Sequence, residues 1–79
     1  KSMEPLLLEV PTGTARKRAL KHEGEEFMYV IRGRVILEYG DEEYTLKAGD
    51  SAYFDGQTEH RLVNLNKKPA QVLSVFGGG

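Results

Sequence analysis

The sequence predicts an all-β domain that closes into a barrel or sandwich, such as a jelly roll. Three observations support this class. Apolar and polar residues alternate in short runs, turn residues interrupt the runs every ~8–12 residues, and no stretch carries the apolar stripe of an amphipathic helix. At 79 residues the chain is sized for one domain, so we expect residues 1–79 to fold as a unit. Closure, or pairing with a second copy, would protect sheet edges that are this apolar.

The first third of the chain predicts two strands joined by a loop. Leu6–Val10 forms the first strand, and the Pro-Thr-Gly sequence at 11–13 ends it. Segment 15–26 contains strong helix formers but has no apolar face to bury, so we interpret it as a loop that enters a strand near His22. Phe27–Ile31 is apolar at every position, which predicts a strand covered on both faces.

The remainder of the chain predicts a series of hairpins. Arg32-Gly33 and Gly40-Asp41 have the composition of tight turns. The strands expected between and after these turns are Val35–Tyr39, 43–46, Ser51–Phe54, His60–Asn64 and Ala70–Phe76. The chain ends in three glycines, so we expect residues 76–79 to form a flexible tail.

Charge and composition exclude several classes of protein. Eleven basic and twelve acidic side chains give a net charge of −1, so we expect this chain alone not to bind nucleic acid. The longest apolar run is Leu6–Leu8, which is far too short for a membrane-spanning helix. The absence of cysteine excludes disulfides and fits the reducing cytoplasm. A small core, together with the apolar strand Phe27–Ile31, predicts a homodimer.

The two histidines are the residues best suited to chemistry. His22 and Glu26 are four positions apart, so they would share a face if both lay in a strand. His60 would meet them if its strand were a neighbour. Two imidazoles and one carboxylate suit a divalent zinc, iron, manganese or nickel ion. Surface or core histidines are more common than ligands, so the spacing leaves a purely structural role open.

Five apolar residues share the parity of these side chains along the predicted strands. They would line an interior ligand pocket, or simply fill the barrel as side chains do in small barrels. These candidate ligand-binding residues are Met28, Val30, Ala52, Phe54 and Leu62. The basic run at 16–18 is interpreted as a solvated loop, because acidic residues follow it closely.

The two histidine segments resemble the two motifs of the cupin family. His22-x(3)-Glu26-x(6)-Gly33 is similar to the first motif, and Gly49-x(10)-His60-x(3)-Asn64 is similar to the second. The resemblance covers nearly the whole chain and implies a small double-stranded β-helix, the cupin barrel.

The resemblance also implies a ligand set that differs from the family pattern. The family's first motif begins His-x-His, and its first histidine falls on Leu20, which cannot bind a metal. The second motif normally has Pro and Gly where this chain has Asp55 and Gln57. The resemblance therefore implies His22, Glu26 and His60 as metal ligands, and leaves open whether a divalent metal is bound.

Segments 22–30 and 49–54 look most like the C-terminal cupin sensor domain of helix-turn-helix (XRE-type) transcriptional regulators. That resemblance implies a cytoplasmic domain that senses an unknown small molecule and dimerises. It also implies a longer parent chain, with a DNA-binding domain ahead of residue 1. Two alternatives stay open, a small metal-dependent enzyme of the dioxygenase or isomerase type and a stand-alone binding cupin. The sequence offers no clear general base beyond the three ligands, which favours a non-enzymatic role.

Overall fold

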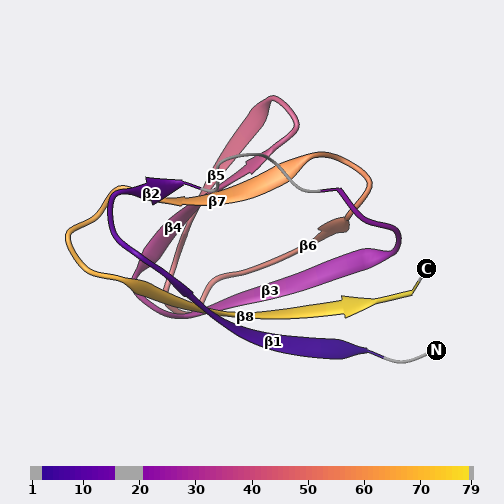
Figure 1. The fold of residues 1–79 in the computed structure, drawn as a ribbon, viewed down its shortest axis with the longest axis horizontal. Coiled ribbons are helices and arrows are strands. Elements are labelled where there is room, and N and C mark those ends of the chain that lie inside the picture. The colour runs from indigo at the N-terminus through magenta and orange to yellow at the C-terminus, as the bar shows by residue number, and fades with distance from the viewer. Residues whose placement is uncertain (1–2, 16–20, 79) are drawn as a thin grey trace.

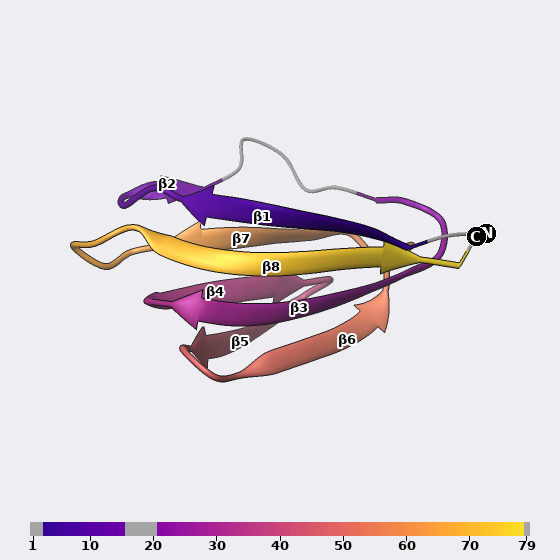
Figure 2. The same cartoon turned by 90° about the horizontal axis from the view of Figure 1, so that it is seen from below.

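In a computed structural model of the protein, the structure describes residues 3–15 and 21–78. Two four-stranded antiparallel sheets face each other (Figures 1 and 2). Their strands in chain order are β1 (Glu4–Val10), β2 (Thr14–Ala15), β3 (Glu25–Arg32), β4 (Arg34–Tyr39), β5 (Glu42–Lys47), β6 (Ser51–Asp55), β7 (His60–Asn64) and β8 (Ala70–Gly77). No helix in the described ranges is long and apolar enough to cross a membrane. The all-β prediction is confirmed.

Strand order in the two sheets determines which residues meet. One sheet has the order β1-β8-β3-β6, and the other has the order β2-β7-β4-β5. The tight turn at Gly33 carries the chain from one sheet to the other, with φ at 89°. A Cβ atom there would lie 2.9 Å from Cα of Ala70, so glycine is required for this close approach as well as for the backbone conformation.

The core forms where the inner faces of the two sheets meet. Met28 and Val30 of β3 are buried against Val35 and Leu37 of β4 and Val72 of β8. These positions alternate with exposed ones, as the pleat of a strand requires.

The outer face of β3 differs from the expectation that this strand is covered on both faces. Phe27, Tyr29 and Ile31 are 38%, 39% and 42% exposed. Among the described strands of one chain, β3 is therefore covered on its inner face alone, because none of them lies over the outer face of this sheet (Figure 2).

Two predicted boundaries are wrong. The flexible tail was expected to begin at Phe76, but β8 continues to Gly77 because its end pairs with Glu25 and Glu26 of β3. The strand expected near His22 begins only at Glu25, after a turn at Gly24 with φ of 86°. The basic run at 16–18 and the leucine at position 20 lie outside the described residues.

Candidate metal centre

Three side chains predicted as ligands meet at one end of the barrel. The Nε2 atoms of His22 and His60 lie 3.0 Å and 3.2 Å from the same oxygen, Oε1 of Glu26. The candidate ligand atoms of all three residues lie within 4.8 Å of one another. The two imidazole rings meet edge to face, with centroids 5.1 Å apart. The geometry suits a single ion bound by two nitrogens and one carboxylate.

His22 reaches this centre from a loop, not from a strand as its spacing to Glu26 suggested. Its backbone N–H donates to the carbonyl of Gly56 at 2.9 Å, and the N–H of Gly56 donates to the carbonyl of Gly24 at 2.9 Å. The His22 ring lies directly over Gly56, since a Cβ atom there would be 2.1 Å from Cε1 of the ring. Sequence reasoning missed Gly56, because its role depends on contact with a loop more than thirty residues away in the chain.

The tautomers of both histidines follow from their second hydrogen bonds. Nδ1 of His60 lies 2.7 Å from the carbonyl of Thr58, and Nδ1 of His22 lies 3.1 Å from the carbonyl of Glu23. A carbonyl only accepts, so each Nδ1 must carry the proton and donate it. In the neutral rings, both Nε2 lone pairs therefore face the carboxylate of Glu26. Three electron-rich atoms converge, and a bound cation would neutralise them.

The carboxylate of Glu26 is a buried charge. Its residue is 4% exposed, and His60 beside it is 5% exposed. Burial raises the pKa of Glu26. Once the histidine rings are protonated, however, their Nε2–H groups donate to this carboxylate, and these hydrogen bonds from His60 and His22 outweigh the effect of burial, so the pKa lies below its ordinary value. No lysine or arginine of the described ranges forms an ion pair with this carboxylate. Since no fixed cation neutralises this buried carboxylate, the donor set fits a divalent metal.

A pocket of about 170 Å³ opens beside two of the three side chains, Glu26 and His60. It is lined by Leu6, Leu8, Glu26, Met28, His60, Arg61, Leu62 and Phe76. Its walls come from β1, β3, β7 and β8, so distant segments of the chain form it together.

The five residues predicted to bind a ligand fall into two groups. Met28 and Leu62 line the pocket. Val30 is fully buried in the core, and Ala52 and Phe54 of β6 pack against that core. Phe54 also lies edge to face with the His60 ring, at a centroid distance of 4.9 Å.

Ser74 is a polar residue near the centre that sequence reasoning missed. It is fully buried on β8, and it pairs with Met28 of β3. Its hydroxyl contributes to lowering the pKa of Glu26, yet its placement allows no hydrogen bond that satisfies normal geometry. A buried hydroxyl without a partner is uncommon, and a small ligand or a water molecule would satisfy it.

The family model described as Cupin domain matches residues 6–76. The HTH-type transcriptional regulator PuuR of Escherichia coli is 29% identical over 63 residues, which is 80% of this chain and 34% of the regulator. The chain spans about half, or less, of the length of the curated relatives that it matches.

Solved structures show the same fold. The cupin domain of an XRE family transcriptional regulator from Enterobacter cloacae has a TM-score of 0.89 at 20% identity, covering 98% of this chain and 82% of that one. The Fe(II) form of HppE with an alternative substrate has a TM-score of 0.81 at 25% identity, covering 96% and 43%. With the family model matching nearly the whole chain, and with the His-Glu-His cluster at the end of a barrel of two antiparallel sheets, the protein belongs to the cupin domain family.

Proposed function

We propose that this cupin domain senses a small molecule through a divalent metal held by His22, Glu26 and His60. The observation that carries the proposal is the convergence of two imidazole lone pairs and a buried carboxylate next to an apolar pocket. Zinc, iron, manganese and nickel all accept such ligands. When bound, the ion supplies a Lewis-acidic centre with open positions for an oxygen or nitrogen of the ligand.

The charge around the centre supports cation binding. Ten carboxylates lie at the end of the barrel that contains the cluster, and we call this the acidic end. They are Glu4, Glu23, Glu25, Glu26, Glu38, Asp41, Glu42, Glu43, Asp55 and Glu59. An excess of negative charge raises the local concentration of cations, so the acidic end favours capture of divalent cations.

The pocket limits the class of ligand. Its volume of about 170 Å³ suits a molecule of few heavy atoms. Leucine, methionine and phenylalanine side chains form most of its walls, while Glu26 and His60 form its polar corner. The expected ligand has a short apolar body and one polar group that reaches the metal, and the walls exclude water around that body.

Similarity to the regulator PuuR supports a sensor role within a longer, cytoplasmic protein. In that role the domain would bind the small molecule, and a separate domain of the parent chain would bind DNA. The coupling between them would be thermodynamic, since the ligand must favour one arrangement of the parent protein over another.

A metal-dependent enzyme is the second candidate. Two histidines and one carboxylate with open positions also suit non-haem iron chemistry, and the similarity to HppE favours that option. One observation disfavours an enzyme. Among the described residues that line the pocket, Arg61 is the one ionisable side chain besides Glu26 and His60, and it is paired with Glu38. Arginine stays protonated and cannot serve as a general base at neutral pH, so the sensor role is better supported.

We also propose that the domain dimerises through the outer face of the sheet β1-β8-β3-β6. Side chains that lie next to one another across the strands form two mostly apolar rows on this face. The apolar residues of the rows are Pro5, Leu7, Phe27, Tyr29, Tyr53, Leu73 and Val75. Ile31 of β3 adds an eighth exposed apolar side chain beside them. Leu7 and Tyr53 are 61% and 68% exposed. A continuous apolar face of this kind marks an interaction surface.

Charges at the two ends of β3 select the arrangement of the dimer. Glu25 lies at the first end of the strand and Arg32 at the last, and both are exposed. A two-fold axis that runs across the strands would place Arg32 of each copy opposite Glu25 of the other. An axis along the strands would instead place like charges together, which is unfavourable.

Metal titration tests the metal site. The purified protein, freed of metal with a chelator, should bind one equivalent of zinc or nickel by calorimetry. Glu26→Gln keeps the shape of the side chain but removes its charge, so this variant should lose at least about tenfold in affinity. Glu23→Gln is the matched control, because Glu23 is exposed and its side chain lies outside the cluster.

Equal affinity in Glu26→Gln and Glu23→Gln would contradict the proposed ligand set. Where metal is bound, a small molecule that binds in a metal-dependent way and is recovered unchanged supports the sensor. Conversion of that molecule supports the enzyme.

A further inference from the structure

The end of the barrel opposite the metal centre carries a cluster of cations. We call it the basic end, and its cations are Arg32, Arg34, Lys47, Lys67 and Lys68. It contains five of the eleven basic residues of the chain, whereas ten of the twelve carboxylates lie at the acidic end. Although the net charge is near zero, negative charge is concentrated at one end of the strands and positive charge at the other.

Three turns form the basic end, and hydrogen bonds tie them together. The N–H of Ala48 donates to the carbonyl of Gly33 at 3.0 Å, joining the turn after β5 to the turn after β3. The side-chain amide of Asn66 donates to the carbonyl of Arg34 at 3.1 Å, joining the loop before β8.

The side chain of Asn64 anchors the loop that carries Lys67 and Lys68. This residue is fully buried, and its side-chain amide donates to the carbonyls of Val10 and Lys68 at 3.0 Å and 2.9 Å. Its side-chain oxygen accepts from the N–H of Asn66 at 2.9 Å. The backbone beneath the two lysines is therefore held in place, and a ligand would not have to order it.

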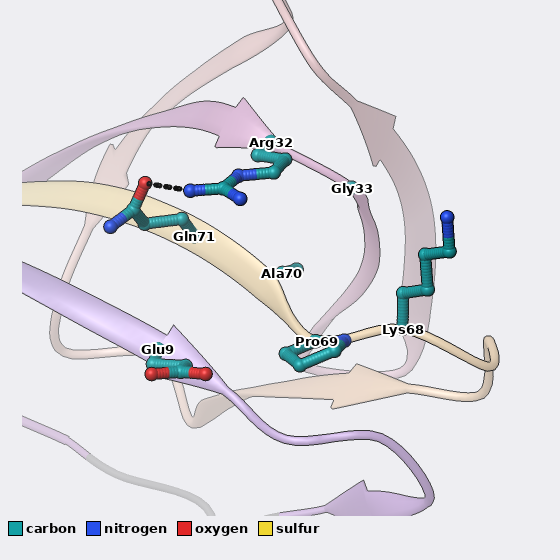
Figure 3. A pocket seen from close by; sticks show the side chains of 7 residues that line it. All are labelled: Glu9, Arg32, Gly33, Lys68, Pro69, Ala70 and Gln71. Carbon is teal, nitrogen blue, oxygen red and sulfur yellow. Dashed lines mark hydrogen bonds between the residues drawn. The ribbon is translucent and has the colours of Figure 1, made fainter.

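Two adjoining depressions lie between these turns. One, of about 410 Å³, is lined by Glu9, Arg32, Gly33, Lys68, Pro69, Ala70 and Gln71 (Figure 3). The other, of about 490 Å³, is lined by Gly33, Arg34, Lys47, Ala48, Asn66, Lys67 and Lys68. They share Gly33 and Lys68, so they form one continuous surface with Lys68 between them.

The cations of this surface have few partners in the described ranges. Arg34, Lys47, Lys67 and Lys68 form no ion pair there. Arg32 donates to Oε1 of Gln71 at 3.4 Å, which Figure 3 shows.

Two carboxylates lie at the same end. Glu9 lines the first depression, and Asp50 accepts the backbone N–H of Lys47 at 2.9 Å. Within one chain, five cations therefore face two carboxylates. With Arg32 opposite Glu25 of the partner subunit in the proposed dimer, the other four cations still leave an excess of positive charge.

We propose that the basic end binds a small, multiply charged anion of the phosphate class. Several ammonium and guanidinium groups can close on such an anion from separate turns, and charge-assisted hydrogen bonds of this kind are the strong ones. Binding would relieve the repulsion among like charges that share one rigid support. The site lies apart from the metal centre and does not depend on the proposed sensor function.

Pyrophosphate is the probe that tests this site. Titrated into the metal-free, ¹⁵N-labelled protein, it should shift the amide signals of residues 32–34, 47–49 and 66–68 and saturate. Replacing both lysines in Lys67→Gln/Lys68→Gln should weaken binding by about tenfold, the loss expected for one charged hydrogen bond. Added sodium chloride should weaken it further, because exposed charges are screened.

Lys21→Gln is the matched control, since it removes an exposed lysine outside both depressions. It should bind pyrophosphate as the unaltered protein does, and the thermal midpoint of each variant would show that it folds. Equal affinity in the double lysine variant would overturn the proposal, as would shifts centred on His22 and His60. A mixed-sequence DNA duplex that shifts the same amides when pyrophosphate does not would also overturn it.

Discussion

A Cβ atom on Gly56 would lie 2.1 Å from Cε1 and 2.3 Å from Nδ1 of His22. The backbone of Gly56 is outside the left-handed region, so alanine is permitted there as far as φ is concerned. The obstacle is the imidazole ring, which can swing away at low cost to stability. The absence of one methyl group at position 56 therefore determines whether His22 reaches the metal centre.

We expect Gly56→Ala to fold normally but to bind metal at least about tenfold more weakly, because it displaces one of three ligands. Calorimetric titration with zinc measures the affinity, and thermal unfolding measures stability. Gly13→Ala should behave in the opposite way. Position 13 has open space around it but a φ of 69°, so alanine there should cost about 1 kcal/mol and leave metal affinity unchanged. Unchanged zinc affinity in Gly56→Ala would show that His22 is not a ligand.

Glu26 also affects stability in acid. Its pKa is lower in the folded protein than in the unfolded chain, where it is about 4.5. The ionised carboxylate therefore stabilises the fold at pH values above about 4.5. That contribution is lost as the pH falls through the folded pKa. In metal-free protein, the difference in unfolding free energy between the unaltered chain and Glu26→Gln should therefore shrink below about pH 4.5. Urea titrations at pH 6 and at pH 3 would measure it, and a difference that grows in acid would contradict the assigned direction.

At the scale of elements, Asn64 connects β7 to the loop before β8. Its side chain makes three hydrogen bonds, to Val10, Lys68 and Asn66, and it is fully buried. Asn64 is the last residue of β7. Its hydrogen bonds hold the end of β1, at Val10, and the loop that leads into β8, at Lys68. The motif resemblance included this asparagine, but the resemblance did not indicate that its role is to satisfy backbone groups.

We expect Asn64→Ala to lower the free energy of unfolding by about 2–4 kcal/mol, because it leaves buried backbone groups without partners. Asn66→Ala is the control. Its exposed side chain donates one hydrogen bond, so the expected loss is about 1 kcal/mol or less. Denaturant unfolding followed by circular dichroism gives both values. Similar losses in the two variants would show that the loop is not anchored through Asn64.

At the scale of the whole molecule, the apolar outer face and the charged ends of β3 lead to a prediction about assembly. The protein should be a dimer at micromolar concentration, since eight exposed or half-buried apolar residues share that face. Arg32→Glu should weaken the dimer by placing like charges opposite each other. Adding Glu25→Arg to the same chain should restore it, because a two-fold axis across the strands brings the two positions together.

Light scattering and sedimentation would measure the mass of each variant. Glu43→Arg, on β5 of the other sheet, is the control for a change in net charge and should remain dimeric. A monomeric mass for the unaltered protein would contradict the dimer. A dimer that Arg32→Glu leaves unchanged would contradict the proposed axis.

Sequence alone determined the fold class and the candidate ligands. Alternation of apolar residues and the spacing of glycines at turns are local properties, and they predicted the all-β fold and most strand boundaries. The two motif segments identified His22, Glu26 and His60. The structure brings these three side chains together, while their role as ligands stays a prediction.

Tertiary structure decided what depends on partners distant in the chain. His22 joins the cluster from a loop over Gly56, although its spacing to Glu26 suggested a shared strand. Phe76 belongs to β8 and the pocket because its strand pairs with β3, although the glycines beside it suggested a tail. Acidic and basic residues are interspersed along the sequence, but in the fold most of them lie at opposite ends of the barrel. Antiparallel strands cause this, because they place each turn at one end or the other. A local pattern of residues predicts a strand but does not predict which strand pairs with it. In this protein the pairing of strands distant in the chain forms the pocket, the candidate metal centre and the basic end.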